Sequence, residues 1–280
     1  MHAFFSHVIK SMTDAIYPPG CFVCGEPYDD AHKNACSRPP PDVPDREMHP
    51  YLCSGCAAAF TPIQSPMCTV CGRMFASADA EDHVCGDCTG TPKRFNSARA
   101  VGLYTDSLMA LIHQLKYNGR TGLARSLGAL LYKGFFRWYD PRNIDMIVPV
   151  PLHGRKFRQR GFNQSYLLIR QWGRSVDISD SGIDTGRIIR NVIVRQRNTR
   201  SQTTLSRKER QENVRGAFQL TDPAMVKDKR ILVIDDVYTT GATVNECART
   251  LMAGGAARVD VLTLARVGGA ISPPVSTPGR

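Results

Sequence analysis

The sequence predicts an α/β fold, in which a parallel twisted sheet flanked by helices follows a small cysteine-rich domain. Two observations support this prediction. Apolar, β-branched runs alternate with helical patterns in the later part of the chain, and such alternation is typical of a parallel sheet with helices on its faces. Nine of the ten cysteines lie between Cys21 and Cys88, before that alternation begins. We therefore expect domains at residues 1–95 and 96–267, with a flexible tail at 268–280.

Each expected element of the later domain has its own pattern. The strands are short apolar or β-branched runs: Ala98–Tyr104, Met146–Val150, Arg187–Val194, Ile231–Ile234 and Val259–Ala265. The helices include stretches with apolar residues at i, i+3, i+4 and i+7: Leu108–Leu115, Leu123–Phe135, Gln164–Trp172 and Thr243–Ala253.

The composition is that of a soluble globular protein. The hydrophobic fraction is 42%, and no apolar run approaches the ~18 residues needed to cross a bilayer. The first twenty residues have the spacing of a short amphipathic helix and lack the basic region and cleavage site of a signal peptide. These observations predict a cytoplasmic protein without a membrane span.

The cysteine-rich domain contains four CxxC pairs: Cys21 and Cys24, Cys53 and Cys56, Cys68 and Cys71, and Cys85 and Cys88. A CxxC turn directs two thiolates at one point, and two such turns complete a tetrahedral Zn²⁺ site with no open position for catalysis. We therefore expect two structural Zn²⁺ sites, with a proline-rich insert at 26–51 between the first two pairs. The pattern leaves open which pairs share a metal, and an iron–sulfur cluster uses the same ligands. A disulfide framework is disfavoured without an export signal.

Two acidic residues, Asp235 and Asp236, follow the buried run ILVI, and a short loop and a helix come next. Ligands of open parallel sheets bind at the carboxyl ends of strands, and a helix start offers N–H groups to an anion. The loop therefore suits a phosphate, and the two carboxylates suit ribose hydroxyls or a hydrated Mg²⁺. An ordinary Asp cap would explain one acid, not both. The loop residues are Thr239, Thr240, Gly241, Ala242 and Thr243.

Positive charge is concentrated upstream of this loop. The net charge is +11, and residues 150–215 carry 15 basic and 5 acidic side chains. Such a window is either a solvated face or a site for a polyanion, and its one-sided charge favours the polyanion. Arg155, Arg158 and Arg160 are candidates to meet pyrophosphate oxygens through forked hydrogen bonds. We expect Arg158 and Arg160 to do so, and Arg160 is preferred over Arg155 because Gly161 follows it.

The polar, basic segment 195–218 contains few apolar residues and is expected to be a mobile loop. Closure of such a loop over a reacting centre would exclude water. Arg197, Gln202 and Arg210 are the candidate ligand-binding residues in this segment.

The stretch ILVIDDVYTTGAT at residues 231–243 resembles the signature of the type I phosphoribosyltransferases. The order of motifs narrows the resemblance: four CxxC pairs, LKYNGR at 115–120, VPVPLHGRKFRQRGFNQS at 148–165, a basic loop, and the acidic strand end. This order looks like the ComF competence family, phosphoribosyltransferase-like proteins with an N-terminal double zinc ribbon. The resemblance covers residues from about 18 to 267, and the insert at 26–51 departs from it.

The resemblance implies the type I phosphoribosyltransferase fold and a site for phosphoribosyl pyrophosphate with Mg²⁺. In that family the loop holds the 5-phosphate and the two acids, here Asp235 and Asp236, hold the ribose hydroxyls. The implied activity is transfer of phosphoribose to a nitrogen acceptor, and the implied partners are competence proteins and single-stranded DNA during DNA uptake. The alternative is a non-catalytic module that binds a phosphorylated ligand or single-stranded DNA. A glutamine-dependent amidotransferase is disfavoured, since residue 2 is His2 and no N-terminal cysteine nucleophile is present.

Overall fold

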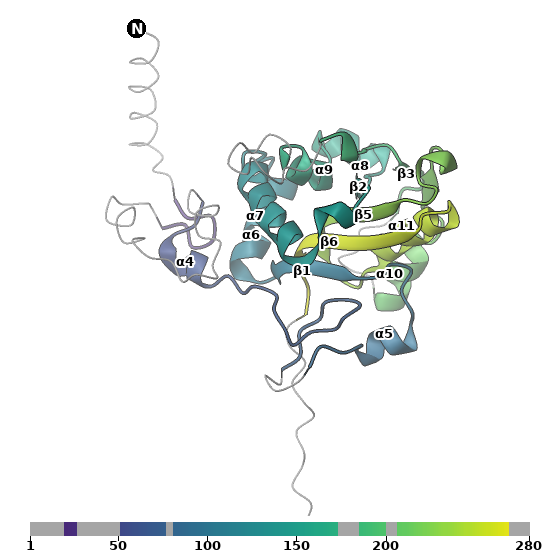
Figure 1. The fold of residues 1–280 in the computed structure, drawn as a ribbon. Coiled ribbons are helices and arrows are strands. Elements are labelled where there is room, and N and C mark those ends of the chain that lie inside the picture. The colour runs from purple at the N-terminus through teal and green to yellow at the C-terminus, as the bar shows by residue number, and fades with distance from the viewer. Residues whose placement is uncertain (1–19, 27–50, 77–80, 173–184, 200–205, 269–280) are drawn as a thin grey trace, which may run out of the picture.

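Figure 1 shows the computed structural model, which describes residues 20–26, 51–76, 81–172, 185–199 and 206–268. The expected N-terminal amphipathic helix lies outside the described residues, as do nearly all of the proline-rich insert and of the C-terminal tail. Within the described ranges, none of the helices combines the length and the apolar character needed to cross a membrane.

The centre of the fold is a four-stranded sheet in the order β1–β6–β5–β2, and each neighbouring pair is parallel. Its strands are β1 (Ala98–Leu103), β2 (Met146–Pro149), β5 (Arg230–Tyr238) and β6 (Arg258–Arg266). The α/β fold predicted from the alternation of strands and helices is confirmed. Since β5 continues to Tyr238, the two acidic residues lie inside the strand and not after it.

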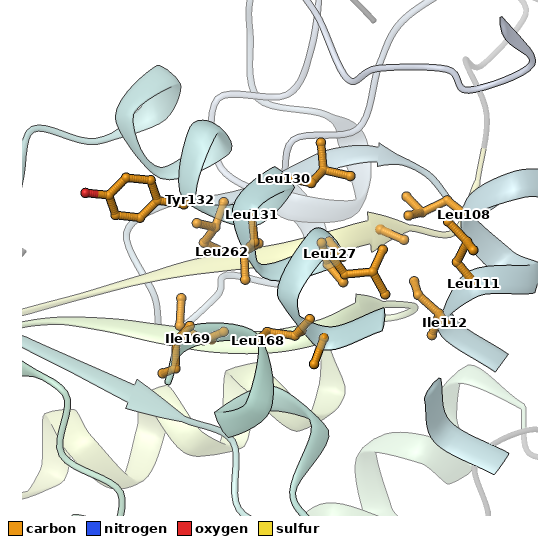
Figure 2. Close-up of a cluster of buried hydrophobic side chains, with 14 of the residues drawn as sticks. Leu108, Leu111, Ile112, Leu127, Leu130, Leu131, Tyr132, Leu168, Ile169 and Leu262 are labelled. Atoms are coloured by element: carbon orange, nitrogen blue, oxygen red, sulfur yellow. The ribbon is translucent and has the colours of Figure 1, made fainter. Parts of the chain in front are cut away.

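Both faces of the sheet are covered, because successive side chains of a strand point to opposite faces. On β5, Leu232 and Ile234 pack into one apolar cluster, while Ile231 and Val233 pack into a second. The first cluster lies under α6 (Asp106–Tyr117), α7 (Leu123–Trp138) and α9 (Gln164–Ile169). Figure 2 shows its packing, with Leu127 and Leu131 of α7 near Leu168 of α9 and Leu262 of β6. The second cluster lies under α11 (Ala242–Ala253).

A smaller antiparallel sheet pairs β3 (Ile193–Arg195) with β4 (Phe218–Leu220). The strand expected at Arg187–Val194 is therefore wrong over most of its length. A 3-10 turn ends at Arg187, a single bridge forms at Ile188, and a turn interrupts the β-branched run at Arg190 and Asn191. The helix expected at 164–172 ends at Ile169.

The polar segment 195–218, expected to be a loop, contains the helix α10 (Arg207–Val214). Its start is a capping box, in which the Ser206 hydroxyl accepts from the Glu209 amide and the Glu209 carboxylate accepts from the Ser206 amide. This S-x-x-E signal is readable in the sequence, whereas the expectation of a loop used only the lack of apolar residues. The remaining short helices are α4 (Ser54–Ala58), α5 (Gly86–Gly90), α8 (Gly154–Arg160) and 3-10 turns at Pro141–Asn143 and Pro223–Met225.

Candidate functional site

The eight cysteines of the CxxC pairs gather into two tetrads. The pairing is sequential: Cys21, Cys24, Cys53 and Cys56 form one tetrad, and Cys68, Cys71, Cys85 and Cys88 form the other. Within each tetrad the ligand atoms lie within 4.8 Å of one another. The structure thus favours sequential over interleaved pairing. Four converging thiolates match the donor set that Zn²⁺ takes in closed structural sites.

His83 is not part of either tetrad. Its ring stacks on Phe75 with centroids 4.0 Å apart, and its Nδ1 lies 2.9 Å from the Glu81 carbonyl oxygen. A ring held in this way needs no metal to explain its position.

The predicted phosphate loop lies between the end of β5 and the start of α11. Gly241 has a φ of 76° and precedes the first helical residue, Ala242. A Cβ at Gly241 would lie 2.3 Å from the Tyr238 hydroxyl oxygen, so the position requires glycine. Gly241 has no side chain to cap the helix, and the Ala242 amide donates only a long hydrogen bond of 3.4 Å to the Thr240 hydroxyl oxygen. The helix dipole at this end favours an anion.

The loop opens into a cavity of about 620 Å³ at the carboxyl edge of the sheet, which we call the site cavity. Its volume lies in the range of small-molecule sites. Six predicted residues besides Asp235 and Asp236 line it: Thr239, Gly241, Ala242, Thr243, Arg160 and Arg210. Because Arg210 comes from α10, the predicted closing segment contributes to the same site. Thr240 faces an adjoining cavity of about 70 Å³.

Asp235 is buried at the floor of the site cavity. Its Oδ1 accepts hydrogen bonds from the Ser165 hydroxyl and from the Asp236 amide, both at 3.0 Å. Burial raises the pKa of Asp235 from 3.8 to about 6, although Lys116 and the hydrogen bond from Ser165 act in the opposite direction. The carboxylate is therefore mostly ionised at neutral pH and held in a fixed orientation.

Lys116, near the end of α6, forms an ion pair with Asp236. The two side chains are 16% and 5% exposed, so the pair is largely removed from water. Burial lowers the pKa of Lys116 to about 8, while the charge of Asp235 opposes that shift. The ammonium therefore stays mostly charged at neutral pH and partly neutralises the acidic floor. Lys116 lies in the segment LKYNGR of the predicted motif order, but no pattern in the sequence indicates that it pairs with Asp236.

Cations line the side of the site cavity next to β2. Lys156 and Arg160 come from α8, and Arg195 comes from the end of β3. Burial lowers the pKa of Lys156, and the neighbouring charges of Arg195 and Arg160 lower it further. Such mutual repulsion is costly without a counter-anion, which favours a polyanionic ligand on this side.

The site differs in part from the predicted set of ligand-binding residues. Among the described arginines, Arg158 and Arg197 lie outside the lining of the site cavity. Arg197 instead donates to the carbonyl oxygens of Asn213 at 3.0 Å and Arg215 at 2.7 Å, which ties β3 to the end of α10. Gln202 lies outside the described residues. Lys156 and Arg195 were missed because nothing in a run of basic residues distinguishes those that point inward.

The second cysteine tetrad lies against the back of the phosphate loop. Arg266, at the end of β6, donates to the Cys71 carbonyl oxygen at 2.8 Å. Its guanidinium lies 4.5 Å from the ring centroid of Tyr238, the residue that precedes the loop. The adjoining small cavity is lined by Cys71 and Cys88 on one side and by Thr239 and Thr240 on the other. The cysteine-rich domain thus supports the loop structurally.

Comparison with known proteins identifies the family. Residues 12–89 match a double zinc ribbon domain, and residues 123–278 match a phosphoribosyl transferase domain. Competence protein F of Haemophilus influenzae is 31% identical over 222 residues, which are 77% of this chain and 90% of that protein. The chain belongs to the ComF competence family. Two further ComF relatives are DNA utilization protein YhgH of Escherichia coli, 35% identical over 78% of this chain and 91% of that protein, and competence protein ComFC of Bacillus subtilis, 26% identical over 77% and 84%.

Membership of the ComF family agrees with both parts of the structure. The parallel sheet and its flanking helices form the phosphoribosyltransferase-like domain, and the two cysteine tetrads are those of a double zinc ribbon. The zinc ribbon match favours Zn²⁺ over an iron–sulfur cluster as the metal of these tetrads. The family resemblance expected from the order of the motifs is confirmed.

Proposed function

We propose that this ComF protein binds phosphoribosyl pyrophosphate with Mg²⁺ in the site cavity. The observation that carries the proposal is the presence of three kinds of binding group in the lining of one cavity. A helix N-terminus suits the 5-phosphate, buried carboxylates suit the ribose hydroxyls, and Lys156, Arg160 and Arg195 suit the pyrophosphate. A ligand with a single phosphate, held at the helix start, would supply no second anionic group for those cations.

Mg²⁺ fits the chemistry of this cavity. Carboxylate and phosphate oxygens are the donors that Mg²⁺ prefers, and it keeps several waters when bound. Among the described lining residues, Asp235 and Asp236 supply the carboxylates, and the ligand would supply the phosphate oxygens. Mg²⁺ would lower the negative charge of the leaving pyrophosphate.

We further propose that the protein transfers the phosphoribosyl group. The bond from the ribose C1 to the pyrophosphate oxygen breaks, and pyrophosphate leaves with the electron pair. The lone pair of an acceptor nitrogen forms the new bond to C1, and the proton of that nitrogen passes to solvent. Lys156, Arg160 and Arg195 would stabilise the growing charge of the leaving group, while Asp235 and Asp236 would orient the ribose.

Calorimetry with phosphoribosyl pyrophosphate and Mg²⁺ tests the binding step. We expect Arg160→Ala to weaken the binding of phosphoribosyl pyrophosphate by about 10-fold or more, as for loss of a charge-assisted hydrogen bond. The same substitution should reduce the affinity for ribose 5-phosphate much less, because this ligand has no pyrophosphate. Arg155→Ala is the matched control, because Arg155 lies exposed on the same helix and outside the cavity lining. Absence of binding at millimolar ligand, or equal affinity for both ligands, would refute the proposal.

A second candidate function is binding of single-stranded DNA during DNA uptake. It is supported by the printed names of the relatives and by the outer face of α8, where Phe157 is 48% exposed between Arg155 and Arg158. Exposed aromatic rings among cations suit unpaired bases and phosphates. Affinity for an oligonucleotide should fall steeply with salt, and Arg155→Ala should weaken it. Affinity independent of salt would exclude this function.

A further inference from the structure

Arg266 is a buried cation at the end of β6, on the wall of the small adjoining cavity. It is 3% exposed, and the ion pairs among the described residues do not include it. Its guanidinium donates to the Cys71 carbonyl oxygen at 2.8 Å and lies 3.5 Å from the Cys71 Sγ, while its Nε has no hydrogen-bond partner in the described part of the chain. A buried charge of this kind is costly unless a counter-charge lies near it.

The second cysteine tetrad supplies that counter-charge when it holds a metal. Cys71 is one of its four members, so Arg266 is in direct contact with the cluster. Four thiolates carry more negative charge than one Zn²⁺ offsets, and the cluster is therefore anionic. Because the metal keeps the four thiolates at one point, its loss would remove the fixed partner of Arg266.

Only one of the two tetrads is placed to act on the phosphate loop. The second tetrad is attached to β1, where the Ala98 amide donates to the Val70 carbonyl oxygen at 2.7 Å and a Cβ at Gly72 would lie 2.7 Å from the Ala98 carbonyl oxygen. The first tetrad instead packs at the start of α6, where the Ser107 hydroxyl donates to the Cys56 carbonyl oxygen. Of the two, the second tetrad is the one that contributes residues to the cavity behind the phosphate loop.

Tyr238 connects Arg266 to the phosphate loop. Its ring centroid lies 4.5 Å from the Arg266 guanidinium, and Phe95 meets the ring edge to face with centroids 6.4 Å apart. The Tyr238 side chain is 4% exposed, and its hydroxyl oxygen lies 2.3 Å from the position of a Cβ at Gly241. The packed ring therefore fixes the backbone of the loop from behind.

We propose that Arg266 couples metal binding in the second tetrad to the affinity of the phosphate loop. The filled tetrad fixes Arg266, Arg266 fixes the ring of Tyr238, and the ring holds the loop at Gly241 in the shape that accepts a phosphate. This inference rests on the proposed function, which places a phosphate in the loop. Arg266 is a positioning residue, because it lines the cavity behind the loop and not the site cavity. Such coupling is reciprocal, so a ligand in the loop raises the affinity for Zn²⁺ by the same factor.

Zinc competition on the wild-type protein tests the coupling without any substitution. A colorimetric chelator measures the affinity of both zinc equivalents at equilibrium, with and without saturating ribose 5-phosphate. We expect the ligand to raise the affinity of one equivalent by about 10-fold, a coupling of typical size, and to leave the other unchanged. Cys24→Ser, which disrupts the first tetrad, should keep the responsive equivalent. Cys88→Ser should lose it and should bind ribose 5-phosphate about 10-fold more weakly in calorimetry.

Arg266→Gln separates the coupling from metal binding alone. This variant should retain both zinc equivalents, bind ribose 5-phosphate about 10-fold more weakly and show no effect of the ligand on zinc affinity. Arg258→Gln is the matched control, because Arg258 lies at the start of the same strand and pairs with Asp260 outside both cavities. The control should behave as the wild type. A role of Arg266 in stability alone would leave the effect of the ligand on zinc unchanged.

The outcomes separate the coupling from the proposed function. If ribose 5-phosphate binds but changes the affinity of neither zinc equivalent, the coupling is refuted while the phosphate site stands. An effect that persists in Arg266→Gln, or that belongs to the first tetrad, also refutes it. If Arg266→Gln does not fold, the wild-type protein and the two cysteine variants decide. If ribose 5-phosphate itself fails to bind, the proposed function fails and the coupling falls with it.

Discussion

Replacing Asp235 by Asn should stabilise the ligand-free protein. Burial raises the pKa of Asp235 from 3.8 to about 6 in the folded state. At pH 7.5 the ionised carboxylate therefore costs about 3 kcal/mol of folding free energy, since one pKa unit is worth about 1.4 kcal/mol. The asparagine side chain has nearly the same shape, and its amide oxygen could still accept from the Ser165 hydroxyl and the Asp236 amide. We expect the free energy of unfolding to rise by up to about 3 kcal/mol at pH 7.5.

The pH dependence tests the cause of this gain. Between pH 3.8 and about 6 the folded state holds the Asp235 proton more tightly than the unfolded chain, so the stability contributed by this group falls as the pH rises. Above pH 6 the penalty is constant. The gain from Asp235→Asn should therefore shrink to about 1 kcal/mol at pH 4.5. Urea unfolding of both proteins at pH 4.5 and 7.5 measures the difference.

Asp145→Asn is a matched control of opposite sign. Hydrogen bonds from Arg230 lower the pKa of Asp145 to about 2, so this carboxylate stabilises the fold above its unfolded pKa, and that contribution is lost as the pH falls toward 2. The same substitution should therefore destabilise the protein at pH 7.5. If Asp235→Asn were neutral or destabilising at pH 7.5, or if its gain were independent of pH, the assignment of a buried ionised carboxylate would be refuted.

Three further changes should each have a distinct result. Lys116→Met leaves the Asp236 carboxylate buried without its cation and should lower the free energy of unfolding by about 3 kcal/mol at neutral pH, measured in urea; an unchanged midpoint would contradict the ion pair. Gly241→Ala forces a methyl group against Tyr238 at positive φ and should lower the affinity for ribose 5-phosphate at least ~10-fold in calorimetry. The circular dichroism spectrum should be retained, and an unchanged affinity would contradict the loop geometry. Cys85→Ser should lower bound zinc from about two equivalents to about one in elemental analysis, and two retained equivalents would contradict the tetrad.

The sequence was informative where one local rule decides the structure. The strands β5 and β6 are continuous apolar runs, which is typical of strands buried on both faces, and both were placed within a few residues. The four CxxC pairs predicted two four-thiolate sites, although not which pairs share a metal, because two cysteines separated by two residues are typical of a metal knuckle. The phosphate loop was also recognisable, since a strand, two acids and a Thr/Gly turn are contiguous in the chain.

The sequence was less informative where residues far apart in the chain meet. Lys116 contacts Asp236 because α6 ends over the carboxyl edge of the sheet. To predict this contact one must know the order of the strands in the sheet, and no local sequence pattern contains that order. The choice among arginines agreed only in part with the cavity lining, for a related reason. Arg158 and Arg160 lie on one helix two residues apart, so they point to different sides of it, and only Arg160 of this pair faces the cavity among the described residues. Helix α10 was not predicted, because it begins with a capping box and has no apolar face for the sequence pattern to show.

The cost of burying Asp235 connects stability to function. Keeping a buried carboxylate ionised lowers the stability of the fold. The acid is therefore explained only by an interaction that an amide at the same position would not make. An asparagine at this position would keep the local hydrogen bonds, so packing alone does not explain the acid. An ionised acceptor gains most when it meets the hydroxyl donors of a sugar, because charge-assisted hydrogen bonds are the stronger ones. The expected opposite responses to Asp235→Asn, higher stability but weaker binding of ribose 5-phosphate, would therefore mark this carboxylate as part of a binding site and not of the core.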